Sequence, residues 1–110
     1  MHPYDPLRFH GMVVWLTEAQ GGRRAGPPDP PPGRDYAANA FVPPLTVDTG
    51  LASFVIRPAT LGAWRCAADA GWLAGSYRYP PDVGRGDVIV VTEVPTVVGY
   101  FHVKSVDEND

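Results

Sequence analysis

The strongest constraint on the fold is a pair of apolar runs in the last quarter of the chain. Val88–Thr92 and Thr96–Lys104 flank Glu93-Val94-Pro95, a three-residue connection that suits a β-hairpin. Side chains in the second run alternate between two faces, Val97, Gly99, Phe101 and Val103 on one and Val98, Tyr100, His102 and Lys104 on the other. We therefore predict an antiparallel hairpin whose first face points into the core.

Further apolar, β-branched and aromatic runs predict more strands at Leu7–Thr17, Tyr36–Val42, Leu51–Arg57 and Trp72–Tyr79. Residues 59–71 suit one or two helical turns as well as they suit a strand, so the pattern leaves both open. About six short strands without βαβ alternation favour an all-β fold, a small closed or nearly closed antiparallel barrel with Greek-key-like connections.

The composition fits a single globular domain over residues 1–110. Apolar residues make up 45% of the chain and charged residues 19%. The 12 glycines and 13 prolines gather in connecting segments, above all in a long loop over residues 18–35, where Pro27 to Pro32 favours an extended path. Residues 105–110 are predicted to form an acidic, solvated tail.

Charge and cysteine content narrow the classes of function. The formal net charge is −3 and Lys104 is the only lysine, which argues against a nonspecific nucleic-acid binder. Cys66 stands alone, so it has no disulfide partner and no companions for a cysteine-based metal site. No apolar run is long enough to span a bilayer, and no signal peptide is recognisable. We expect a cytoplasmic protein that does not engage membranes.

Two segments resemble the third domain of elongation factor Tu, the bacterial translation GTPase. Thr17-Glu18-Ala19-Gln20-Gly21-Gly22-Arg23-Arg24, after the strand at 11–16, resembles the strand and Glu-Gly-Gly-Arg that open that domain, and Gly86 to Val103 resembles its closing hairpin. At the second turn the family has Glu-Gly-Gly-Arg where this chain has Glu93-Val94-Pro95-Thr96. The resemblance implies a β-barrel that docks on a macromolecule, as the family's domain does on transfer RNA and partner proteins. The GTPase phosphate-binding loop is absent from the sequence, so nucleotide hydrolysis is not implied.

Two parts of the chain are candidate partner contacts. Arg23 and Arg24 follow two glycines and could offer forked donors to a carboxylate or phosphate; the alternative is a solvated turn in which they pair with Glu18 or Asp29. Trp64 and Trp72 bracket the ambiguous residues 65–71 and belong to the part of the chain least like the family. An exposed aromatic residue next to Arg65 suits an interface, although most aromatic residues are expected in the core.

No group of residues in the sequence forms a motif that identifies a reaction. His2, His10 and His102 form no catalytic or zinc motif, although His10 and His102 lie on strands that could be neighbours, and Cys66 is expected to be a small buried thiol. We predict no catalytic residue, no cofactor and no metal. The expected function is a non-catalytic module that binds a protein. The alternatives are a decoy or immunity-type mimic of an elongation factor domain and an RNA-binding module; an enzyme or small-molecule binder is least expected.

Overall fold

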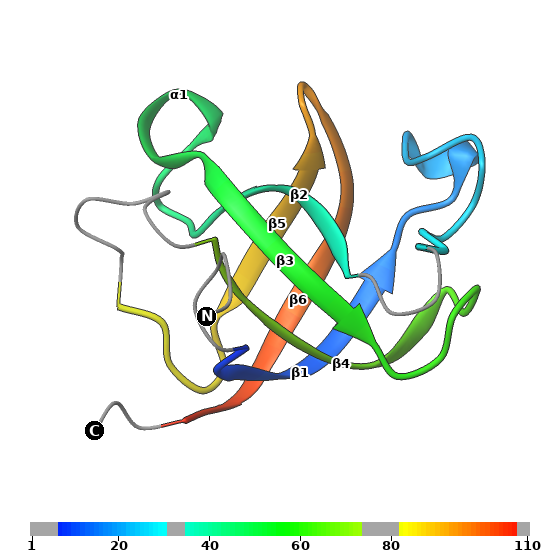
Figure 1. Cartoon of the computed structure of the whole chain (residues 1–110). Coiled ribbons are helices and arrows are strands. Elements are labelled where there is room, and N and C mark those ends of the chain that lie inside the picture. Colours follow the sequence, from blue (N-terminus) through cyan, green and yellow to red (C-terminus); the bar gives the residue numbers. More distant parts are fainter. Residues whose placement is uncertain (1–6, 31–34, 74–81, 108–110) are drawn as a thin grey trace.

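The chain forms a closed barrel of antiparallel strands. The structure is a computed structural model and describes residues 7–30, 35–73 and 82–107. The strands are β1 (Phe9–Trp15), β2 (Tyr36–Phe41), β3 (Ala52–Pro58), β4 (Arg65–Trp72), β5 (Val88–Glu93) and β6 (Thr96–Val106). They pair in the order β1-β4-β3-β2-β5-β6, and β6 returns to β1 (Figure 1). The prediction of a small all-β barrel of six strands is confirmed.

Little of the described chain is helical. A 3-10 turn at Glu18–Gln20 follows β1, and a single-turn helix, α1 (Val47–Gly50), lies between β2 and β3. Both begin with a threonine whose side chain accepts a backbone N–H, as N-cap residues do. No helix in the described ranges is long and apolar enough to cross a membrane.

The core fills the barrel interior with side chains that alternate along the strands, except where the register of the β5–β6 pair shifts. Phe54 of β3 lies at its centre, with ring centroids 4.8 Å from Trp72, 6.0 Å from Phe101 and 6.4 Å from Phe9. The largest side chains that are essentially inaccessible to water come from β1, β3, β5 and β6: Phe54, Phe101, Ile56, Ile89, Val13, Val91, Val98 and Thr92. Aromatic rings and β-branched side chains on alternate positions explain why these segments form strands.

The C-terminal hairpin is confirmed, with two corrections. Glu93 pairs with Thr96, so two residues connect the strands rather than three. Phe101 and Val103 face the core as predicted, but Val98 is also buried, at 1% exposed, on the face predicted to be outside. The cause is a register shift between Val91 and Thr92, because an extra residue in β6 reverses the alternation beyond the bulge.

The open segment at 59–71 is resolved as a loop followed by β4. The predicted strand at Trp72–Tyr79 is wrong at its start, since Trp72 ends β4 and Leu73 follows outside the strand; residues 74–79 lie outside the described ranges. β4 has neighbours on both sides, β1 and β3. Pairing on two sides stabilises a strand whose alanines have low intrinsic β-propensity.

The predicted acidic tail begins later than residue 105. β6 continues through Val106, which pairs with Phe9, and Ser105 pairs with His10. Asp107 then donates its backbone N–H to the carbonyl of Arg8 at 2.8 Å. Pairing with the start of β1 therefore makes Ser105 and Val106 part of the barrel. The start of β1 and the end of β6 lie side by side.

Candidate functional site

Arg23 anchors the loop after β1 to the barrel. Its Nε donates to Glu93 Oε2 at 2.8 Å, its Nη1 donates to the Gly26 carbonyl at 2.6 Å, and its Cζ lies 5.9 Å from the Tyr36 ring centroid. Tyr36 donates its hydroxyl to the same Glu93 carboxylate, and burial, together with that hydrogen bond, raises the pKa of Tyr36. Arg23 therefore holds the loop, and its acidic partner within the chain is Glu93, not Glu18 or Asp29.

Arg24 provides a matched comparison, because it is exposed and has no ion pair among the described residues. Arg23→Ala should lower the free energy of unfolding by about 1–2 kcal/mol, since it removes two charge-assisted hydrogen bonds from a partly exposed site. Arg24→Ala should change it by less than about 0.5 kcal/mol. Urea unfolding of the two variants measures this difference. Equal effects would show that the contacts of Arg23 do not stabilise the loop.

Trp64 and Trp72, grouped by sequence, lie in different environments. Trp72 is 7% exposed and packs against Phe54 in the core, so it is not part of a binding surface. Trp64 is 44% exposed at the end of the β3–β4 connection, close to exposed Leu61 in sequence. Its carbonyl accepts the N–H of Trp15 at 2.8 Å, which fixes its backbone to the end of β1.

The Trp64 ring also reaches the loop that Arg23 anchors. A Cβ placed on Gly26 would lie 3.9 Å from two carbons of the indole, which is ordinary van der Waals contact. Arg23 holds the carbonyl of that same Gly26. The structure thus brings two predicted site residues, Arg23 and Trp64, to one end of the barrel, where Arg23 holds the loop residue Gly26 and the exposed indole lies close to it.

Arg65, the remaining candidate, turns to the outside of the barrel. A pocket of about 350 Å³ lies there over three adjacent strands, β4, β1 and β6, and is lined by Met12, Val14, Arg65, His102 and Lys104. Cross-strand pairing explains the grouping, because Val14 is opposite Arg65 and Met12 is opposite His102. We name this the outer pocket. The alternation of β6 predicts that His102 and Lys104 share a face, but their β1 and β4 neighbours follow only from the strand order.

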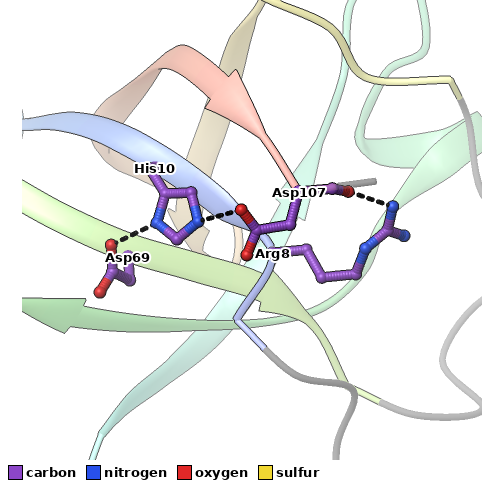
Figure 2. Close-up of polar contacts among 4 residues, drawn as sticks. All are labelled: Arg8, His10, Asp69 and Asp107. Atoms are coloured by element: carbon purple, nitrogen blue, oxygen red, sulfur yellow. Dashed lines mark hydrogen bonds and ion pairs between the residues drawn. The ribbon is translucent and has the colours of Figure 1, made fainter. Parts of the chain in front are cut away.

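A second polar group ties the first strand to the last. His10 Nδ1 lies 2.7 Å from Asp69 Oδ1 on β4, and His10 Nε2 lies 2.9 Å from Asp107 Oδ1, just beyond β6 (Figure 2). Arg8 Nη2 donates to the Asp107 carbonyl at 2.6 Å. Hydrogen bonds to Asp69 and then Asp107 raise the pKa of His10, because both favour the imidazolium. His10 and His102 lie on neighbouring strands as expected, but they pair with other residues.

The His10 contacts predict a pH-dependent stability. Because the folded-state pKa of His10 is raised above 6.5, its contribution is complete below that pH and is lost as the pH rises through the folded-state pKa. The His10 side chain is 36% exposed and the two carboxylates more so, so we expect less than about 1 kcal/mol. His10→Gln should flatten the change in urea-unfolding free energy between about pH 5.5 and about pH 8.5. An unchanged profile in His10→Gln would contradict the prediction.

A smaller pocket of about 280 Å³ adjoins His10 and is lined also by Arg57 and Asp69. Its polar groups already have partners, since Arg57 donates two hydrogen bonds to the Asp35 carboxylate at 2.8 and 3.0 Å and Asp69 contacts His10. Nothing in this pocket requires a ligand.

The Cys66 thiol is only partly buried and lies 3.5 Å from the Thr60 carbonyl. Within the described ranges, no three His, Cys, Asp or Glu side chains are grouped to hold a metal.

Comparison with known proteins gives no family. No protein-family model matches the chain, and neither a curated protein nor a solved structure shows significant similarity to it. The likeness of Gly86 to Val103 to the closing hairpin of the elongation factor Tu third domain therefore stays a prediction.

Proposed function

We propose that this chain is a non-catalytic module that binds a protein partner through surface complementarity, with Trp64 as the anchor of the contact. The observation that carries the proposal is the indole itself, which is 44% exposed, lies close to Gly26 and is carried on a backbone fixed to Trp15. An exposed aromatic side chain held in one place loses little conformational entropy on binding, and tryptophan is enriched among the residues that dominate interfaces.

The surroundings of Trp64 support a protein rather than a nucleic acid. Arg65 follows it on β4 and lines the outer pocket with Lys104, over an apolar floor. An RNA site would need more cations, because the release of counterions from several phosphates provides most of the affinity. Both ring nitrogens of His10 face carboxylates, so neither is placed to activate a nucleophile, which supports a binding role over a catalytic one. The resemblance of Gly86 to Val103 to the elongation factor Tu third domain implies the same docking role.

Affinity capture tests the proposal. The tagged chain is incubated with a lysate of the source cells, with and without ribonuclease, and bound proteins and RNA are identified. We expect a protein that resists ribonuclease and whose affinity falls about 30-fold in Trp64→Ala, the effect of losing about 2 kcal/mol. Val94→Ala is the matched control, since Val94 is 48% exposed in the β5–β6 turn.

Two results of the capture experiment would contradict the proposal. Retention of RNA alone, lost on ribonuclease treatment, would replace the protein partner with a nucleic acid. A captured protein that binds Trp64→Ala and Val94→Ala equally well would show that Trp64 is not the anchor.

A further inference from the structure

We propose that the outer pocket binds an acidic segment of the protein partner, with carboxylates held by Arg65 and Lys104 and an apolar side chain seated on Met12 and Val14. This inference rests on the proposed function, which supplies the kind of partner. It adds the chemistry that the partner must present and places the contact on the outside of β4, β1 and β6.

The two cations of the outer pocket, Arg65 and Lys104, form no ion pair with a carboxylate among the described residues. Arg65 Nε contacts the Met12 thioether at 2.9 Å, a weak acceptor that leaves the other guanidinium donors available. Lys104 forms no ion pair with any residue in the described ranges. Arg23 and Arg57, by contrast, both reach acidic side chains. In a chain of net charge −3, two cations beside one pocket and without carboxylates favour an acidic ligand.

The spacing of the cations favours a segment with more than one carboxylate. Arg65 is opposite Val14, and Val14 is in turn opposite Tyr100, so Lys104 lies four residues farther along β6. Strand spacing and rise together then place the backbones of Arg65 and Lys104 about 15 Å apart. In an extended peptide, side chains at positions i and i+4 point to the same face about 13 Å apart, within reach of two long basic side chains. The side chain at i+2 lies between them on the same face, so an apolar residue there meets Met12 and Val14.

The closed barrel limits the ways in which the partner's segment can bind. All six strands have neighbours on both sides, so the barrel offers no free edge to which a peptide could add as a further strand. Recognition must use side chains. The pocket supplies apolar contact and cationic hydrogen-bond donors together, with the His102 ring at its border. Trp64 directly precedes Arg65 in the chain, so the proposed anchor is next to a residue that lines the outer pocket.

A peptide titration tests the inference on the full chain. The probe is a capped peptide of sequence Asp-Ser-Leu-Ser-Asp, and its control is the uncharged Asn-Ser-Leu-Ser-Asn. Binding is followed by NMR of the Met12 methyl group and by the dissociation constant. We expect the acidic peptide to shift the Met12 signal and to bind at least about 10-fold more tightly than the control, with an affinity that falls as salt is added.

Charge-removing variants locate the contact. Arg65→Gln and Lys104→Gln should each weaken the acidic peptide about 5- to 10-fold, as expected for losing one charge-assisted contact of about 1 kcal/mol. Arg24→Gln, which removes an exposed arginine outside the pocket, should change the affinity less than about 2-fold. Unfolding curves of the three variants exclude a general loss of structure.

Several results would overturn the inference. Equal binding of the two peptides, an unshifted Met12 signal, or equal effects of Arg65→Gln and Arg24→Gln would each do so. Free butyrate that binds as tightly as the peptide would replace the acidic segment with a small carboxylate. A captured partner that loses affinity in Trp64→Ala but not in Arg65→Gln with Lys104→Gln would overturn this inference alone and leave the proposed function standing.

Discussion

Replacing Phe54 with alanine should lower the free energy of unfolding by about 3–5 kcal/mol, the largest effect we expect from any single change to the core. Phe54 is fully buried and contacts rings from three other strands, Phe9, Trp72 and Phe101. Removing its ring forfeits the burial of the aromatic surface and leaves a cavity that rings fixed to separate strands cannot close.

Urea unfolding followed by circular dichroism measures this loss. Phe41→Ala is the matched control, because Phe41 ends β2 and is only partly buried, so the same change should cost about 1 kcal/mol. If Phe54→Ala does not fold, Phe54→Leu keeps part of the volume and should still cost more than Phe41→Ala. Equal costs for Phe54→Ala and Phe41→Ala would contradict the central place of Phe54 in the core.

The strands that could be predicted are those with strong local patterns. The β5–β6 hairpin has two runs rich in β-branched residues on either side of a short turn, and this alone predicts its position. The reversal at Val98 could not be predicted, because it depends on one extra residue opposite β5. β4 was left open for a different reason. Its Arg65–Trp72 sequence is rich in alanine, and it becomes a strand through pairing with β1 and β3 rather than through local preference.

The candidate site divides in the same way. Sequence reasoning identified Trp64 and Arg65 from an aromatic next to a cation, and both lie at the surface. It could not give Arg23 its partner, because Glu93 is 70 residues away along the chain. The partners of His10 were missed for the same reason, since Asp69 is 59 residues away and Asp107 was assigned to the tail. Contacts between distant residues follow from the strand order, which a single sequence does not provide.

Gly11→Ala should be the second most damaging change, with a loss of about 3 kcal/mol at the upper end of the usual range for overpacking. A Cβ at this position would lie 1.9 Å from the His102 carbonyl oxygen and 3.2 Å from the Lys104 nitrogen. Both are backbone atoms of β6, so no side-chain rotation can make room. β1 and β6 would have to separate where the register shifts between His10 and Gly11.

Gly11→Ala should also disturb its neighbours on β1, because Gly11 lies between His10 and Met12. His10, on one side, joins Asp69 to Asp107, and Met12, on the other, forms the floor of the outer pocket opposite His102. In Gly11→Ala, the NMR signals of the Met12 methyl group and the His102 ring should therefore shift together with the loss of stability measured in urea. Gly84→Ala is the control, since a Cβ there meets nothing within 4 Å. If Gly11→Ala were as stable as Gly84→Ala, β1 and β6 would not be held at this distance, and the outer pocket would lack the rigid floor that selective binding of an acidic segment requires.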